Sequence, residues 1–450
     1  MPGNTARKTL VLNVVGLTPK LLKHAPNLRR LADETGVRPL MPPVPAVTCT
    51  SQMAMLTGTA ASEHGIVGNG WYDRSYAEVK FWKQSDGLVQ RPRVWDRLAG
   101  VTCANLFWWY AMYCGADVTV TPRPMYPADG RKLPDIWTNP VELRDLLQRR
   151  LGQFPLFKFW GPMANIESTR WIADAAIEVE RRFGCDLTLV YLPHLDYALQ
   201  KVGPDHASIP AEVERVDAEV GKLLGVFDDA AVRVVSEYGI EPVDTPVHLN
   251  RVLRRNGWLS IRYELGRELL DAGASRAFAV SDHQVAHVYA EEAVIPDVAE
   301  VLAATEGIAD VIFGSARREL GLDHERAGDI IVLAERGAWF TYYYWFDDAK
   351  APDFARTVDI HRKPGYDPAE LFLDPDIRFP KLRIARKLAA RKAGLRAMLD
   401  VTPIDASCVR GSHGLVPSSP DEGPLLIGAG NGDVAPMTDV ADVIRDAVLG

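Results

Sequence analysis

The chain has 450 residues, of which 47% are hydrophobic and 24% are charged, a composition typical of a globular protein with a sizeable core. Its formal net charge of −8 is unlike the basic footprint of a general nucleic-acid binder, so we expect no nucleic-acid polymer as a partner. Five cysteines without a C-x-x-C spacing indicate reduced thiols and argue against a disulfide scaffold.

Short apolar runs alternate with helical patterns along the first half of the chain. The runs at 9–17, 101–106, 187–192 and 232–235 predict strands. Strands that alternate with helices are typical of a parallel sheet. We therefore predict an α/β protein with a doubly wound, mostly parallel sheet and helices on both faces.

The first apolar run follows two basic residues, a pattern that superficially resembles a signal peptide. The run is short and no A-x-A cleavage pattern follows it, so we interpret it as the first core strand. No apolar stretch reaches about 18 residues, the length that a membrane span needs. We expect a cytoplasmic protein, and the sequence leaves its oligomeric state open.

The stretch from Pro45 to Gly70 is the most informative part of the chain. Thr48 stands at the start of a predicted helix, and Asn69 follows 21 residues later in a Gly-rich loop. A hydroxyl at a helix N-terminus meets orphan N–H groups and a positive dipole end, which suit a bound phosphate. The Asn69 amide offers one more donor. Taken singly, an N-cap for Thr48 and a turn for Asn69 are common uses of these residue types.

The pattern changes from about residue 258. The segments 264–272 and 296–304 predict helices, whereas 285–290 and 330–334 predict strands. We therefore predict three parts: the first part of the core at 1–257, a smaller inserted α/β subdomain at 258–350, and a C-terminal part at 351–450. The last part returns to the core sheet near 425–427.

The segment 378–396 predicts a basic helix, with an apolar stripe and no acidic residue. A basic amphipathic helix can lie on an anionic membrane surface, cover an acidic patch of its own chain, or contact a protein partner. The sequence leaves these alternatives open. The basic residues are Arg378, Lys381, Arg383, Arg386, Lys387, Arg391, Lys392 and Arg396.

The motif around Thr48 resembles the type I phosphodiesterase/nucleotide pyrophosphatase branch of the alkaline phosphatase superfamily. The family pattern P-T-x-T-x-x-N-H, T-G and H-G-I-x-x-N is approximated by residues 45–52, 57–58 and 64–69. Four further matches follow in family order. They are the opening strand at 9–17, the D-x-x-x-H segment from Asp196 with its G-P at 203–204, the S-D-H-G-M position at 234–240, and the late G-T-H-G at 411–414.

The resemblance implies a hydrolase, or a phosphoryl or nucleotidyl transferase, of small-molecule phosphate esters, in first place phosphodiesters. Thr48 matches the nucleophile that forms a covalent phospho-threonine, and Asn69 matches the residue that stabilises the oxyanion. It also implies one or two divalent metal ions, zinc first with magnesium or manganese as alternatives, under a cap at 258–350. Two alternatives are a catalytically impaired member of the fold that binds a ligand or partner, and a phosphonate or sulfate-ester hydrolase.

Several metal ligands of the family are replaced in this chain. Asp196 and His413 match two ligands of one metal, and the third, a histidine in the family, is Gln200 here. At the second metal, the family's opening aspartate aligns with Val15 and its D-H pair with Glu237-Tyr238. Valine cannot ligate a metal, whereas Gln200 and Glu237 offer oxygen atoms and Tyr238 a phenol. The site can therefore hold one metal, a harder ion bound through oxygens, or a metal with new ligands.

Candidate replacement ligands are Asn13, which faces the same side of its strand as Val15, and His283 and His361, which lie beside or near acidic residues. A histidine that is simply hydrogen-bonded in the core is the alternative for both. Candidate substrate contacts are Arg123, Arg131 and Lys132 on a predicted rim loop, and Tyr238. Solvated surface charge is the alternative for the three basic residues.

Overall fold

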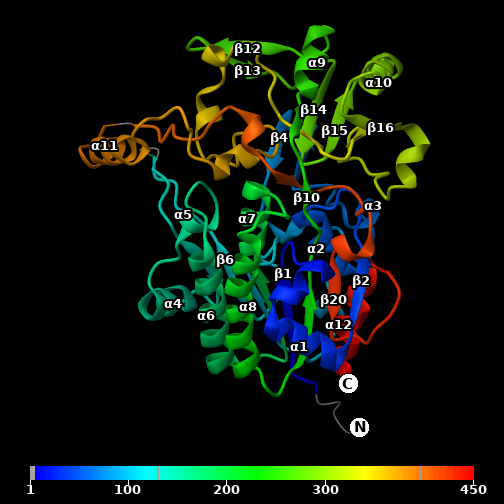
Figure 1. Ribbon diagram of the computed structural model, residues 1–450, viewed down its shortest axis with the longest axis vertical. Helices are drawn as coiled ribbons and strands as arrows, with labels where there is room; N and C mark the ends of the chain where they lie inside the picture. The colour runs from blue at the N-terminus through cyan, green and yellow to red at the C-terminus, as the bar shows by residue number, and fades with distance from the viewer. Residues whose placement is uncertain (1–5, 129–130, 396) are drawn as a thin grey trace.

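The computed structural model describes residues 6–128, 131–395 and 397–450 (Figure 1). Arg396, the last residue of the predicted basic helix, lies outside these ranges. Figure 1 shows a larger part around a central sheet with both chain ends at its base, a smaller part above it, and helix α11 (Pro380–Lys392) standing away from both. No helix among the described residues is long and apolar enough to cross a membrane.

The central sheet has nine strands in the order β21-β2-β20-β9-β1-β8-β5-β6-β7. Its middle strands run parallel, and antiparallel pairs join β7 to β6 and β20 to both β9 and β2. The predicted α/β fold class is therefore confirmed. The bounds are β1 (Thr9–Val14), β2 (Val37–Met41), β5 (Cys103–Leu106), β6 (Val118–Pro122), β7 (Ile136–Asn139), β8 (Leu187–Leu192), β9 (Ala231–Val235), β20 (Leu425–Ile427) and β21 (Ala435–Pro436).

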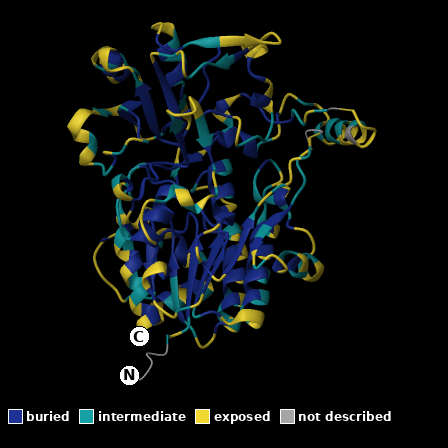
Figure 2. Cartoon of the chain, turned by 180° about the vertical axis from the view of Figure 1, so that it is seen from behind, coloured by how far each residue is buried: buried dark blue, intermediate teal, exposed yellow. Residues whose placement is uncertain are grey.

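The middle strands are apolar because helices cover the sheet. Every residue of β1 and β8 is buried, as expected for parallel strands that are covered on both faces (Figure 2). Helix α6 (Ile166–Phe183) packs on β5 and β8, and α12 (Val440–Leu449) packs on β1 and β9. Helix α8 (Ile209–Val226) contacts both α6 and α1 (Pro26–Thr35).

A second, four-stranded antiparallel sheet has the order β14-β15-β17-β16. Its strands are β14 (Ala277–Asp282), β15 (Val285–Ala290), β16 (Ile308–Phe313) and β17 (Ile330–Ala334), and α10 (Ile295–Ala303) packs on β16. All of these elements fall within the range 258–350. The proposed domain boundaries themselves stay a prediction.

The helix predicted at 264–272 is wrong. The chain forms a hairpin there, with β12 (Ile261–Glu264) paired to β13 (Arg267–Leu270). The two residues between the strands, Leu265 and Gly266, have φ values of +50° and +77°. Two consecutive left-handed residues are typical of a tight hairpin turn whose twist matches that of the strands.

The remaining α-helices and strands are short or lie near the site. They are α2 (Thr48–Thr57), α3 (Ala61–His64), β3 (Gly70–Asp73), β4 (Glu78–Phe81), α4 (Leu143–Leu151), α5 (Leu156–Phe159), α7 (His194–Val202), β10 (Glu241–Pro242), β11 (Thr245–Val247), α9 (Leu249–Arg255), β18 (Ala338–Phe340) and β19 (Gly411–Ser412). The pair β10–β19 brings the segment at His413 beside the segment that follows β9.

Candidate active site

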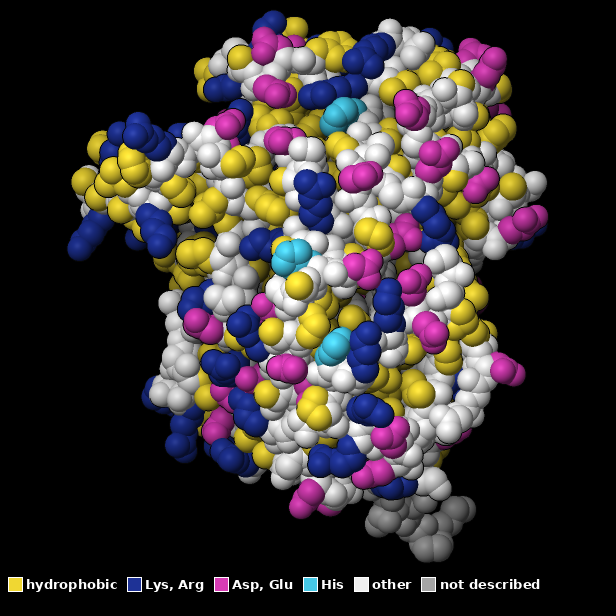
Figure 3. Space-filling view, viewed as in Figure 1, with side chains coloured by type: hydrophobic (Ala, Val, Ile, Leu, Met, Phe, Trp, Pro, Cys, Tyr) yellow, Lys and Arg dark blue, Asp and Glu magenta, His cyan; other side chains and the backbone are white. Residues whose placement is uncertain are grey.

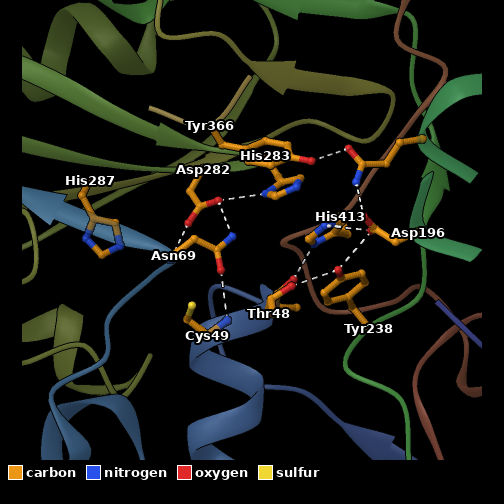
Figure 4. Close-up of polar contacts among 12 residues, drawn as sticks. Thr48, Cys49, Asn69, Asp196, Tyr238, Asp282, His283, His287, Tyr366 and His413 are labelled. Carbon is orange, nitrogen blue, oxygen red and sulfur yellow. Dashed lines mark hydrogen bonds and ion pairs between the residues drawn. The ribbon is translucent and has the colours of Figure 1, made fainter. Parts of the chain in front are cut away.

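The candidate site lies where the central strands end. Asp196 follows β8 in the first turn of α7, and Glu237 and Tyr238 follow β9. Open α/β sheets bind ligands at the carboxyl ends of their strands, because the loops that follow parallel strands meet there. Helix α2 presents its first residue, Thr48, to the same place (Figure 4).

The Thr48 hydroxyl is oriented by a tyrosine. Val47, not Thr48, occupies the N-cap position of α2, and no side-chain capping bond is made there. Its Oγ1 lies 3.2 Å from the Tyr238 hydroxyl, which donates to Asp196 Oδ1 at 3.1 Å. Because tyrosine has a single hydroxyl proton, Thr48 is the donor to Tyr238. The three groups form a directed chain of hydrogen bonds.

Asn69 is held by a residue of the second sheet. Its backbone N and Nδ2 donate to the two oxygens of Asp282, at 2.8 and 3.0 Å, and its Oδ1 accepts from the Cys49 amide at 3.0 Å. One of the two Nδ2 protons remains for a ligand. Asp282 ends β14 and also contacts His283 Nδ1 at 2.8 Å. The second sheet therefore fixes Asn69 beside the start of α2.

Four buried rings form a continuous stack in the order Tyr238, His413, His283, Tyr366. The successive ring centroids are 3.5, 3.6 and 3.7 Å apart. Burial lowers the pKa of His413 and of His283 well below the ordinary value, so both imidazoles are neutral. His283 takes a left-handed φ of +62° in the turn between β14 and β15, a conformation uncommon for a residue with a side chain.

Asp196 is surrounded by neutral donors. Gln200 Nε2 donates to Asp196 Oδ2 at 2.8 Å, and the Tyr366 hydroxyl donates to Gln200 Oε1 at 2.9 Å. Burial raises the pKa of Asp196 to about 6, although the hydrogen bonds from Gln200 and Tyr238 act in the opposite direction. His413 Nε2 faces Asp196 Oδ1 at 3.9 Å, which is too long for a hydrogen bond.

Glu237 is bound within the protein. Its Oε1 accepts from Asn13 Nδ2 at 2.7 Å and from Gln52 Nε2 at 2.6 Å. Burial raises the pKa of Glu237 to about 8, so the carboxyl group is protonated at neutral pH. Together with the apolar side chain of Val15, this arrangement leaves no charged ligand for a second metal at this end of the site.

The residues present do not fit a two-metal centre. In the ranges that the structure describes, no three His, Cys, Asp or Glu side chains gather as a metal site. They do fit one ion. His413 Nε2 is buried without a hydrogen-bond partner in the described chain, and the facing Asp196 carboxylate has acceptor capacity beyond its two bonds. Gln200 directs Nε2 to Asp196 and Oε1 to Tyr366, so its side-chain amide would have to turn to offer its oxygen as a third ligand.

The structure brings most of the predicted site residues together; the other four are His361, Arg123, Arg131 and Lys132. His361 Nδ1 is 3.2 Å from the Phe81 carbonyl oxygen. Arg123 and Arg131 are exposed, and burial lowers the pKa of Lys132. The contacts described for His361, Arg123 and Lys132 do not include Thr48 or its hydrogen-bonded partners. Their predicted roles in metal or substrate binding stay predictions.

Three residues of the site, Asp282, Gln52 and Tyr366, have no role predicted from the sequence. Asp282 could have been found from the sequence, because it is a carboxylate next to the candidate ligand His283. Gln52 and Tyr366 act through contacts with residues 185 and 166 positions away in the chain. No local pattern in the sequence indicates such pairs.

Comparison with known families decides the affiliation. The sequence model of the type I phosphodiesterase/nucleotide pyrophosphatase family matches residues 9–367. The chain belongs to this family. It is accordingly a hydrolase of the alkaline phosphatase superfamily, and this family is generally dependent on divalent metals. No curated protein sequence matches the chain significantly.

Two solved structures share the fold of this chain at low sequence identity. Phosphonoacetate hydrolase from Sinorhizobium meliloti 1021, in complex with phosphonoformate, aligns with 99% of this chain and 96% of its own, at 14% identity and a TM-score of 0.64. Murine ectonucleotide pyrophosphatase/phosphodiesterase 5, an inactive variant in complex with AMP, aligns with 98% of this chain and 95% of its own, at 14% identity and a TM-score of 0.58.

Proposed function

We propose that this family member hydrolyses a small phosphate ester, in first place a phosphodiester, through Thr48 as the nucleophile. The position of Thr48 supports the proposal: its Oγ1 lies at the N-terminus of α2 and is joined to Asp196 through Tyr238. A transferase would use the same first step and would then pass the phosphoryl group to an acceptor other than water.

The proposed reaction has two displacement steps. Thr48 Oγ1 attacks phosphorus and the bond from phosphorus to the leaving oxygen breaks, while the Thr48 proton passes to the Tyr238 oxygen and the Tyr238 proton to Asp196 Oδ1. The leaving alkoxide takes a proton from solvent. Water then attacks phosphorus and the bond from phosphorus to Thr48 Oγ1 breaks, while the Asp196 proton returns through Tyr238 to Thr48 Oγ1 and the attacking water releases a proton to solvent. The free Asn69 Nδ2 proton and the N-terminus of α2 stabilise the oxyanion in both steps.

We also propose that Asp196, His413 and Gln200 hold one divalent ion. Zinc is the first expectation because imidazole and carboxylate ligands suit it, and the oxygens of Asp196 and Gln200 leave magnesium or manganese as alternatives. When bound, such an ion supplies positive charge to the phosphoryl oxygens. The small-molecule ligands named for the two solved relatives, phosphonoformate and AMP, are consistent with a phosphate-sized ligand in this chain.

A second candidate is a fold retained for binding. The enclosure of Glu237 by Asn13 and Gln52 favours it, because that carboxyl is no longer available at the second metal position. A third candidate is a hydrolase that cleaves a phosphonate or a sulfate ester instead of a phosphate ester. The likeness to phosphonoacetate hydrolase supports the phosphonate. Assays with an aryl phosphodiester, an aryl phosphomonoester, phosphonoacetate and an aryl sulfate separate these candidates.

Substitution of Thr48 tests the nucleophile. We expect Thr48→Ala to lower turnover more than about 1,000-fold, because no other oxygen stands at this position, and Thr48→Ser to retain part of it. Thr50→Ala is the matched control, since Thr50 is buried in the same helix and its hydroxyl has no partner among the described residues. Turnover of Thr48→Ala at the rate of the control would refute the nucleophile, provided that both variants are folded by circular dichroism.

A further inference from the structure

A projecting arm around α11, residues 378–395 with 397 and 398, is the most unusual surface of the described molecule. Figure 1 shows α11 held away from the body on two extended segments, and Figure 3 shows basic and hydrophobic side chains gathered on it. A helix of 13 residues is about 20 Å long, which is too short to cross a bilayer. The arm can therefore lie along a surface but cannot span a membrane.

The arm concentrates positive charge in an acidic protein. The segment 378–396 carries eight basic residues and no acidic residue, whereas the whole chain has a formal charge of −8. The rest of the chain therefore has a formal charge of −16. A block of like charge that is set apart in this way is typical of a segment that meets an oppositely charged surface.

The arm also exposes large apolar side chains. Phe379, Leu382, Leu388 and Leu395 are 60%, 67%, 49% and 64% exposed. Of the 21 exposed large hydrophobic residues in the described chain, these four and Met398 lie on the arm. Exposed apolar side chains that gather between basic ones are typical of a binding surface.

Within the described ranges, the charge of the arm is only partly neutralised by its own protein. Arg383 and Lys387 pair with Asp400, at the base of the arm. Lys381, Arg386 and Lys392 are exposed and take part in no ion pair within the described ranges. In the structure, this helix therefore does not cover an acidic patch of its own chain, which was one of the three alternatives for the segment.

We propose that the arm docks on an anionic membrane surface. The exposed lysine and arginine side chains would meet lipid phosphates, and Phe379, Leu382, Leu388 and Leu395 would enter the boundary between headgroups and acyl chains. An acidic protein face would satisfy the positive charge, but it offers no apolar layer for these four side chains. The proposal is independent of Thr48, because vesicle binding is measured without turnover.

Vesicle flotation with the full-length protein tests the proposal. The probes are phosphatidylcholine vesicles with and without about 30% phosphatidylglycerol, at low and high salt. We expect binding to the anionic vesicles alone, with a partition coefficient that falls at high salt because the charges are screened. The triple variant Lys381→Gln, Arg386→Gln, Lys392→Gln should bind more than about tenfold more weakly. Leu382→Gln with Leu388→Gln should also weaken binding.

The matched control neutralises three exposed basic residues far from the arm, with Lys23→Gln, Arg29→Gln and Arg30→Gln. It should bind anionic vesicles like the wild type, and all variants should unfold at the wild-type temperature. No binding to anionic vesicles at low salt would overturn the proposal. So would an equal loss in the control and arm variants, or retention by a polyglutamate column without any binding to vesicles.

Discussion

At the scale of single residues, neutral hydrogen-bonding groups stand where the family resemblance places metal ligands. Gln200 donates to Asp196, Tyr238 links Thr48 to Asp196, and Glu237 accepts from two amides. These hydrogen bonds pair many of the buried polar atoms of the site, but Glu237 Oε2, His283 Nε2 and His413 Nε2 have no partner in the described chain. The nucleophile position is kept, while the surroundings of the second metal are rebuilt as a hydrogen-bond network.

Glu237→Gln tests, through the pH dependence of stability, whether Glu237 is protonated in the folded protein. Burial raises the pKa of Glu237 from 4.5 to about 8, so its proton is held more strongly in the folded state. The resulting stabilisation is complete below pH 4.5 and is lost as the pH rises toward 8. The glutamine variant lacks this loss. Between about pH 5 and 8, the free energy of unfolding of the variant should therefore rise relative to that of the wild type, by up to about 1.4 kcal/mol per pH unit.

Urea unfolding at several pH values measures the difference. Glu264→Gln, at a carboxyl exposed on the β12–β13 hairpin, is the control and should follow the wild type at every pH. If Glu237→Gln follows the wild type in the same way, Glu237 is ionised in the folded protein and the neutral network around it is wrong.

Site residues that lie in short sequence motifs could be predicted, whereas residues that act through contacts between distant segments could not. Thr48, Asp196 and His413 lie in short motifs with family spacing, and the structure places them within one cluster. Asp282 and Tyr366 contribute through contacts across more than 160 residues, which only the tertiary fold creates. His361 has an acidic residue nearby in sequence, a local pattern that does not say which side chains it meets in the fold, and its role as a ligand stays a prediction.

At the scale of elements, the β14–β15 hairpin connects the second sheet to the site. Its turn carries Asp282 to Asn69 and places His283 on His413, and the Gln284 amide donates to the His413 carbonyl oxygen at 3.0 Å. The strand at 285–290 was predicted from the sequence pattern, but its role depends on the turn before it. The segment 264–272 was predicted as a helix but forms the β12–β13 hairpin, because the left-handed turn at Leu265-Gly266 reverses the chain.

Asp282→Asn tests whether this hairpin positions Asn69. The asparagine side chain has one acceptor oxygen where Asp282 uses two, so the Asn69 amide should lose its orientation and turnover should fall about tenfold or more. Asn69→Ala alone should have a similar or larger effect. If Asp282 acts through Asn69, the double variant should be no slower than Asn69→Ala. Losses that multiply in the double variant would show that Asp282 acts independently of Asn69.

At the scale of the whole molecule, the segments at the end of the central sheet supply Thr48, Asp196 and Tyr238, and the second sheet supplies Asp282 and His283. The site therefore exists only when the two sheets are docked, which explains why its buried polar groups pair across the junction. The fold class followed from the alternation of strands and helices. The contact between the two sheets could not be predicted, because a sequence pattern indicates that an element is buried but not which other element packs against it.

The central claim is that the site around Thr48 has one ion position where the family centre has two. Elemental analysis of protein purified without chelators, and then dialysed against zinc, magnesium or manganese, tests it most directly. We predict one divalent ion per chain in the wild type and in Glu237→Gln, and none in His413→Ala. Two ions per chain, or no ion under any of these conditions, would contradict the claim.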